Sequence, residues 1–260
     1  MSRKLIFLDV DGTLVDFTMH MPESAREALS IARKRGHLIS LCTGRTVTNI
    51  YPWLLDFGFD AIVASAGAYV SANDKVIYHS VLANDKVQDM VEVLKEHGAC
   101  FMLQGINGRY VDEENAKKMR ERCMRLGLDI DGALNGLTLE SGMYFDADIP
   151  VDVMQKKVGN YIKITGASFG KDRQMSGEMT KMGVNKATGM QRLMDELKIG
   201  REDTIAFGDG PNDVEMLQFA GTGVAMGNAI PAVKQYADMV TDKIDEDGLY
   251  HAFERLHLLG

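Results

Sequence analysis

The chain contains few of the residues that mark special structural classes. Among 260 residues there are 3 cysteines, 5 prolines and 1 tryptophan. The cysteines, Cys42, Cys100 and Cys123, form no C-x-x-C pair, which argues against a disulfide scaffold and is typical of reduced thiols in a cytoplasm. No apolar run approaches the ~20 residues of a membrane span. The first run is broken at Asp9, too early for a secretory signal. We therefore expect a cytoplasmic protein that does not enter a membrane.

Positive charge is also scarce. The formal net charge is −8 and the pI is near 5.3, so we expect neither a nucleic acid nor an anionic membrane as partner. An anionic ligand would have to be bound by local cations. The 6 histidines show no metal-ligand spacing, and we interpret all of them as structural or surface residues.

Apolar patterning predicts the fold. Short apolar runs predict strands at 5–8, 38–42 and 61–63, and helices are expected at 22–35 and 47–57. The alternation returns near the C-terminus, with strands at 204–207 and 223–226 and helices at 211–219 and 231–237. Strands that alternate with helices favour a doubly wound, Rossmann-like parallel α/β sheet, encoded here at both ends of the chain.

The middle of the chain has a different pattern. Hairpin signals occur at Asn73-Asp74 and Asn107-Gly108, and helical periodicity occurs at 87–97 and 113–126. The stretch 132–142 has no clear pattern. We predict an α/β core of residues 1–81 and 183–260, with an inserted smaller α+β domain of residues 82–182.

The stretch Asp9-Val10-Asp11-Gly12-Thr13 directly follows the first expected strand. In an extended segment, side chains two residues apart point the same way, so Asp9 and Asp11 would share a face. Two such carboxylates repel each other unless a proton or cation separates them, and hard oxygen ligands favour Mg²⁺. The alternative is an ordinary Asp- and Gly-rich turn.

Three further clusters lie at expected strand ends or helix starts, where ligands collect in doubly wound sheets. Thr43-Gly44-Arg45 offers a hydroxyl and an open backbone N–H, although such a tripeptide is more often a helix cap. Lys186 is at a helix start, where a solvated surface lysine is the more common case unless an anion lies nearby. The third cluster, 208–213, offers Asp209, Asn212 and Asp213, of which the last two could merely cap a helix.

In this order, the clusters at Asp9–Thr13, Thr43, Lys186 and 208–213 resemble the first, second, third and fourth motifs of the haloacid dehalogenase superfamily of phosphatases. Within that superfamily, the chain resembles the Cof-type branch with an inserted α/β cap. The resemblance implies Asp9 as the nucleophile and Asp11 as the general acid and base. It implies Mg²⁺ bound by Asp9, by the Asp11 backbone carbonyl and by Asp209, with Asp213 supporting the metal indirectly. The phosphoryl group would be bound by Gly12, Thr43, Gly44, Lys186 and Asn212.

The chain departs from the Cof-type pattern at one place. This branch usually has Asn-Gly after the third strand, where this chain reads Ser65-Ala66-Gly67-Ala68, so substrate orientation there is open. The segment 158–181 is also short for a full cap. Cap residues such as Arg109, Tyr110 or Phe145 could face the leaving group, although packing is the more common role.

The resemblance predicts a Mg²⁺-dependent phosphatase that acts on small phosphorylated metabolites, with sugar phosphates as the favoured class, through an aspartyl-phosphate. Two alternatives stay open: phosphoryl transfer to a second substrate, as in a phosphomutase, and a non-catalytic Mg²⁺-dependent sensor of a phospho-ligand. The expected partner is a small phosphate ester, and we expect a monomer or a small homo-oligomer.

Overall fold

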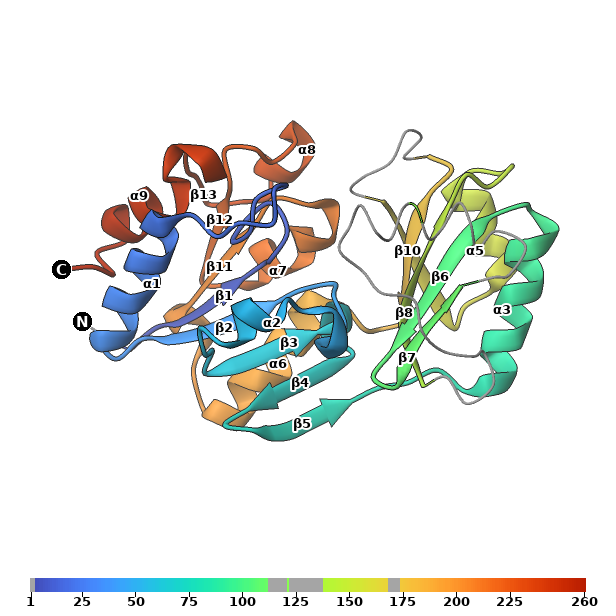
Figure 1. Cartoon of the computed structure of the whole chain (residues 1–260), viewed down its shortest axis with the longest axis horizontal. Helices are drawn as coiled ribbons and strands as arrows, with labels where there is room; N and C mark the ends of the chain where they lie inside the picture. Colours follow the sequence, from blue (N-terminus) through green and yellow to red (C-terminus); the bar gives the residue numbers. More distant parts are fainter. Residues whose placement is uncertain (1–2, 112–120, 122–137, 168–173) are drawn as a thin grey trace. The chain divides into compact units, whose positions relative to one another are not determined.

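The computed structural model describes residues 3–111, 121, 138–167 and 174–260. The chain forms two compact units (Figure 1). The core unit comprises Met1–Gly44, Pro52–Tyr78 and Asn185–Gly260, and the insert unit comprises Arg45–Tyr51 and His79–Val184. In the described part of the chain, no helix is long and apolar enough to cross a membrane.

The core unit is built on a sheet with the strand order β13-β12-β11-β1-β2-β3-β4-β5. Pairing is parallel from β13 through β3, and β4 pairs antiparallel with β3. The predicted α/β fold is therefore confirmed, with an antiparallel edge added to the parallel sheet. The strands are β1 (Leu5–Leu8), β2 (Leu38–Cys42), β3 (Ala61–Ala64), β4 (Tyr69–Ala72), β5 (Lys75–His79), β11 (Thr204–Gly208), β12 (Thr222–Ala225) and β13 (Met239–Val240).

Both faces of the central strand β1 are buried, as its unbroken apolar run predicts: all four of its residues are 0% exposed. Leu5 and Phe7 belong to the apolar core formed with α6 (Lys186–Leu197) and α7 (Val214–Phe219). On the other face, Phe207 is in register with Leu8 and packs against Phe253 of α9 (Gly248–Arg255), with ring centroids 5.4 Å apart. Helix α1 (Glu23–Lys34) contacts α9 (Figure 1).

Three of the expected helices are shorter than their periodicity predicted. The 47–57 helix is interrupted: Val47–Asn49 is a 3₁₀ turn, Ile50 is extended, and α2 is limited to Pro52–Leu55. Pro52 disfavours helical geometry at the residue before it, which explains the break. The 211–219 helix begins as a 3₁₀ turn over Pro211–Asp213, and α8 ends at Lys234. Two further 3₁₀ turns are Arg201–Asp203 and Ile244–Glu246.

The insert unit has a second sheet, with the order β7-β6-β8-β10-β9, in which neighbouring strands pair antiparallel over the described residues. Its strands are β6 (Cys100–Gly105), β7 (Gly108–Val111), β8 (Leu139–Phe145), β9 (Ile162–Gly166) and β10 (Gly177–Lys181), and its helices include α3 (Asn84–Glu96) and α5 (Val151–Val158). The segment 158–181 thus contributes two strands, and β8 begins inside the stretch 132–142. The helix expected at 113–126 falls almost wholly outside the described residues.

Residues 45–51 belong to the insert unit although they follow a core strand, which the sequence did not indicate. Asn49 donates a hydrogen bond to Gln104, and Arg109 donates one to the Thr48 carbonyl at 3.2 Å. Arg109 is 6% exposed and Phe145 is 1% exposed. For these two side chains the structure therefore shows burial within the insert unit.

A substitution at Gly67, in the turn after β3, tests how closely the core unit is packed near α6. Its φ is +98°, and a Cβ there would lie 2.1 Å from the carbonyl oxygen of Asn185, the residue before α6. We expect Gly67→Ala to lower the free energy of unfolding by several kcal/mol, because strain and a backbone clash add.

Gly36 is the matched control, since its φ is +90° but a Cβ there would meet nothing within 4 Å. Gly36→Ala should cost only about 1 kcal/mol, the penalty of the left-handed conformation. Urea unfolding of both variants measures the difference. If both variants lost the same free energy of unfolding, the clash with Asn185 would be relieved by movement of the turn.

Candidate active site

The predicted clusters meet at the carboxyl ends of three neighbouring strands. Strand β1 lies between β2 and β11, so Asp9, Thr43 and Asp209 follow adjacent strands. The Asp9 N–H donates to the Phe207 carbonyl at 3.0 Å, which continues the ladder one residue beyond β1. Asp9 is 6% exposed and Thr43 is 1% exposed, so both are buried at this edge of the sheet.

The loop after Asp9 turns tightly against Asp209. Asp11 pairs with Val15 in a β-bridge, and the Gly12 N–H donates to the Val15 carbonyl at 2.8 Å. Gly12 has a φ of +87°, and a Cβ there would lie 2.3 Å from Asp209 Oδ2. Thr13 Oγ1 donates to Asp209 Oδ1 at 2.9 Å. Only glycine fits at position 12, because both the backbone angle and the carboxylate exclude a side chain.

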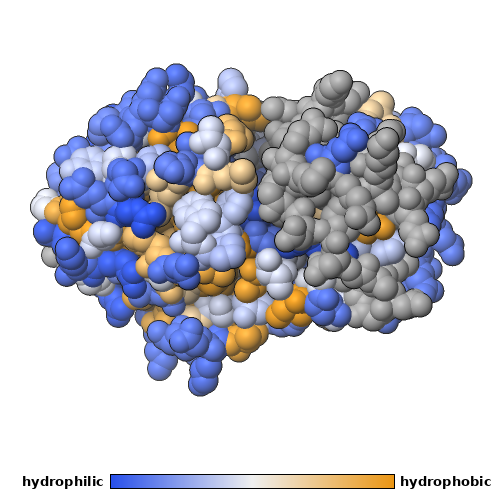
Figure 2. All heavy atoms as spheres, viewed as in Figure 1, coloured by the Kyte–Doolittle hydropathy of each residue, from blue (hydrophilic) through white to orange (hydrophobic). Residues whose placement is uncertain are grey.

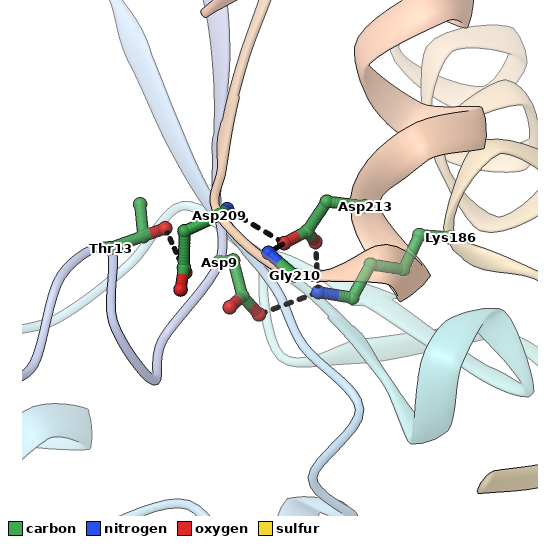
Figure 3. Close-up of polar contacts among 6 residues, drawn as sticks. All are labelled: Asp9, Thr13, Lys186, Asp209, Gly210 and Asp213. Atoms are coloured by element: carbon green, nitrogen blue, oxygen red, sulfur yellow. Dashed lines mark hydrogen bonds and ion pairs between the residues drawn. The ribbon is translucent and has the colours of Figure 1, made fainter. Parts of the chain in front are cut away.

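Lys186 is the first residue of α6 and is fully buried. Its Nζ donates to Asp9 Oδ1 and to Asp213 Oδ1, each at 2.5 Å (Figure 3). The more common alternative for this residue, a solvated surface lysine, is therefore wrong. The capping box of Asn185 and Thr188 satisfies the start of α6, and this leaves the lysine side chain to bind the two carboxylates.

Asp213 holds the loop that carries Asp209. It is 0% exposed, and its Oδ2 accepts hydrogen bonds from the N–H groups of Asp209 at 2.9 Å and of Gly210 at 2.8 Å (Figure 3). Its other oxygen accepts from Lys186. Asp213 therefore orients both the lysine and the fourth-motif loop, a role larger than that of a helix cap.

Asn228, which follows β12, is a part of this arrangement that the sequence did not indicate. Its Nδ2 donates to the Gly12 carbonyl at 2.7 Å, and its Oδ1 accepts from the Ile244 N–H at 3.0 Å. One end of the amide thus holds the Gly12 loop, and the other end joins Asn228 to the segment that begins at Ile244. The only signal in the sequence was its position, two residues after an expected strand of the core.

Two carboxyl groups at this edge, those of Asp9 and Asp209, have raised pKa values. Burial raises the pKa of Asp9 well above its ordinary value, and Asp213 adds to this while Lys186 opposes it. Burial, then Asp213, raise the pKa of Asp209 to about 7. Burial lowers the pKa of Lys186, but Asp213 and Asp9 outweigh it, so the lysine stays charged. Burial also raises the pKa of Cys42, which therefore stays a thiol.

These carboxylates could hold a metal ion. Oxygens of Asp9, Asp209 and Asp213 all lie within 4.8 Å of one another. The Asp213 oxygens already accept three hydrogen bonds, from Lys186, Asp209 and Gly210, and a metal bound to them would displace a donor. Asp9 and Asp209 are therefore the better pair of ligands. Crowded buried carboxylates fit a hard divalent cation, which would offset the repulsion that raises their pKa values.

The remaining predicted site residues are placed as follows. Asp11 is exposed, Gly44 follows Thr43 directly, and Asn212 lies in the 3₁₀ turn next to Asp213. The roles of Asp11 in proton transfer and metal binding, and the phosphate contacts of Gly44 and Asn212, stay predictions. The turn over Ser65–Gly67 is built with Ser65 at φ 51° and Ala66 at φ 50°, and the Ala66 N–H donates to the Thr43 carbonyl at 2.9 Å. This turn therefore lies next to the second motif. The left-handed backbone of Ser65 and Ala66, which are not glycine, carries a conformational cost.

Four of the 6 histidines have polar partners outside this site. His79, His97 and His251 pair with Glu140, Asp148 and Asp242 respectively, and His37 accepts from the Lys4 N–H. Within the described residues, the acidic group that could bind a metal contains no histidine. The structural interpretation of these four histidines agrees with their contacts.

A family model for haloacid dehalogenase-like hydrolases matches residues 6–253. The chain belongs to this family. It is 30% identical over 261 residues to the putative phosphatase YkrA of Bacillus subtilis (strain 168), covering 100% of both chains. It is also 30% identical over 260 residues to the 5-amino-6-(5-phospho-D-ribitylamino)uracil phosphatase YitU of the same organism, covering 94% of both.

Solved structures agree with this assignment. A structure that shows a trigonal-bipyramidal intermediate in a phosphoryl-transfer superfamily matches with a TM-score of 0.87 and 28% identity, over 99% of this chain and 100% of that one. The subclass IIB sugar phosphatase BT4131 matches with a TM-score of 0.83 and 29% identity, over 98% and 99%. The resemblance to Cof-type phosphatases is confirmed, and the protein is a phosphatase of this family.

The raised pKa of Asp209 predicts a pH dependence of stability. The folded protein holds this proton more tightly than the unfolded chain, because the pKa rises from 3.8 to about 7. The resulting stabilisation is complete below pH 4 and is lost as pH rises towards 7, with an upper bound on the order of 4 kcal/mol. In the presence of EDTA, wild type should lose stability relative to Asp209→Asn between pH 4 and pH 8.

Urea unfolding of both proteins at several pH values measures this difference. Asparagine can still accept the hydrogen bond from Thr13, so the comparison isolates the ionisation. If the difference in unfolding free energy between wild type and Asp209→Asn were the same at every pH tested, Asp209 would not be buried among charges in the metal-free protein.

Proposed function

We propose that the protein is a Mg²⁺-dependent phosphatase that hydrolyses small phosphate esters, sugar phosphates in particular, through an aspartyl-phosphate on Asp9. The observation that carries this proposal is the buried Lys186 ammonium, which contacts Asp9 and Asp213 beside Asp209 (Figure 3). The sugar-phosphate class is supported by the likeness to a sugar phosphatase and to a phosphatase of a phosphoribityl compound.

In the first step, an Asp9 carboxylate oxygen attacks phosphorus and the bond to the leaving oxygen breaks. Asp11 gives its proton to that leaving oxygen. In the second step, Asp11 takes a proton from water, which attacks the same phosphorus and releases phosphate from Asp9. Covalent capture thus divides one difficult displacement into two easier ones.

The approach of Asp9 to a phosphate dianion is opposed by repulsion of about 4 kcal/mol for one pair of charges 4 Å apart at an effective dielectric near 20. Lys186 offsets part of this repulsion because its ammonium group contacts Asp9 directly. Mg²⁺ bound by Asp9, the Asp11 carbonyl and Asp209 would supply the remaining positive charge. Asp213 supports that set by orienting Lys186 and the backbone of Asp209.

The phosphoryl oxygens need donors that face the metal site. We assign this role to the Thr43 hydroxyl, the Gly44 backbone N–H, the Asn212 amide and the Lys186 ammonium. The Gly12 N–H, which the resemblance also implied, already donates to the Val15 carbonyl and is not a donor here. Thr43 follows the strand next to Asp9, and Asn212 precedes Asp213, so both lie on segments that border the carboxylates.

Asp9→Asn tests the nucleophile. We expect turnover of a sugar monophosphate with Mg²⁺ to fall at least 10³-fold, since an amide cannot form the acyl phosphate. The fold should persist, because Lys186 keeps its contact with Asp213. Asp195→Asn is the matched control, as Asp195 is an exposed carboxylate on α6. Full activity of Asp9→Asn would refute the mechanism, and an isomerised ester in place of free phosphate would identify a phosphomutase.

Thermal unfolding with and without Mg²⁺ tests the metal site independently of turnover. A ligand at 100 times its Kd stabilises a protein by about 2.7 kcal/mol, so saturating Mg²⁺ should raise the Tm of wild type by several degrees. Asp209→Ala should abolish this shift, whereas Asp195→Ala should retain it. An unchanged shift in Asp209→Ala would place the metal elsewhere.

A further inference from the structure

The segment Asp16–His20 forms a closed loop immediately after the Asp11 turn. Asp16 Oδ1 accepts hydrogen bonds from the Thr18 N–H at 2.8 Å, the Thr18 hydroxyl at 2.7 Å and the His20 N–H at 3.0 Å. The Asp16 N–H donates to the His20 carbonyl at 2.9 Å, and the Met19 N–H donates to the Asp16 carbonyl at 3.0 Å. One carboxylate therefore organises the whole loop.

This loop stays organised at neutral pH. Burial would raise the pKa of Asp16, but hydrogen bonds from Thr18 and His20 outweigh it and lower that pKa. The carboxylate is thus charged at neutral pH, and hydrogen bonds to a charged acceptor are the stronger kind. The loop can therefore hold its backbone, including that of Phe17, in a defined conformation.

Phe17 is presented to solvent by this loop. It is 84% exposed, the largest exposed fraction among the large hydrophobic side chains of the described residues. Figure 2 shows that the coloured atoms of the visible face are mostly hydrophilic, with apolar residues scattered among them. At this exposure Phe17 contributes little to the apolar core, so its side chain has no evident role in folding.

The position of the loop relates Phe17 to the leaving group, if Asp11 acts as proposed above. A general acid must lie within hydrogen-bond reach of the leaving oxygen. Asp11 is bridged to Val15, and Phe17 is two residues further on. The Cα atoms of Asp11 and Phe17 are then at most about 13 Å apart, given ~3.8 Å per residue and about 5 Å across a β-bridge. The side chains of Asp11 and Phe17, with the alcohol part of a substrate between them, can span this distance.

We propose that Phe17 is a specificity-determining residue that contacts the alcohol part of the substrate. Its ring selects phosphate esters whose alcohol part presents an apolar face, such as the C–H face of a sugar ring or a planar heterocycle. Contact with such a face removes apolar surface of both groups from water. Esters of small polar alcohols gain little from this residue. The inference rests on the proposed function, because it needs Asp11 as the acid at the leaving oxygen.

The test compares Phe17→Ala with wild type on two probes, 4-nitrophenyl phosphate and glycerol phosphate, in the presence of Mg²⁺. We expect KM for 4-nitrophenyl phosphate to rise about tenfold, which is the effect of losing roughly half of the burial of a phenylalanine side chain. KM for glycerol phosphate should change less than twofold. Inhibition by inorganic phosphate, which occupies only the phosphoryl position, should be unchanged. Phe17→Leu should retain most of the preference for the aryl ester.

Val76→Ala is the matched control. Val76 is another exposed apolar residue, 57% exposed, on the edge strand β5, four strands from β1. Val76→Ala should leave KM for both probes unchanged. The proposal would be overturned if Phe17→Ala raised KM equally for the two probes, or changed inhibition by phosphate. It would also be overturned if the substitution changed none of these values. A wild type that hydrolyses neither probe, nor any other phosphate ester, would instead contradict the proposed function.

Discussion

The arrangement of this site depends on one buried ammonium group. Lys186 Nζ lies between Asp9 and Asp213, which are 177 and 27 residues away in the sequence. A lysine without these partners could not stay charged at 0% exposure, and the two carboxylates would repel each other without it. The contact therefore joins three segments of the core, namely the end of β1, the start of α6 and the turn before α7.

The lysine is placed by the backbone around it. Asn185 and Thr188 cap α6, and Gly67 lies so close that a Cβ would meet the Asn185 carbonyl. The Gly67 turn also includes Ala66, whose N–H donates to the Thr43 carbonyl. The strained turn after β3 is thus connected to both the second and the third motif. This connection explains why two residues with left-handed backbones can persist there, since the surrounding contacts determine their conformation.

Much of this arrangement could be predicted from local sequence, and the failures have physical causes. Strand β1 and the clusters at Asp9, Thr43 and Asp209 were predictable because a buried parallel strand has a continuous apolar run and its carboxyl end is where ligands collect. The prediction of one continuous helix over 47–57 was wrong. The apolar periodicity continues through Pro52, but the proline interrupts the helix. The burial of Lys186 and the hydrogen bonds of Asn228 depend on distant partners, which local patterns do not contain.

The charges of the site also determine the order of binding. When all are ionised, the carboxylates of Asp9, Asp209 and Asp213 and the ammonium of Lys186 carry a net charge of −2. A phosphate dianion would meet this negative charge in a largely buried setting, where repulsion is strong. Protons can relieve the repulsion, as the pKa of Asp209, raised to about 7, indicates, but in the proposed mechanism a protonated Asp9 could not attack phosphorus. A divalent cation would relieve it and leave Asp9 ionised. In that mechanism the cation would serve substrate binding as well as the chemical step, and it would bind before the phosphate ester or together with it.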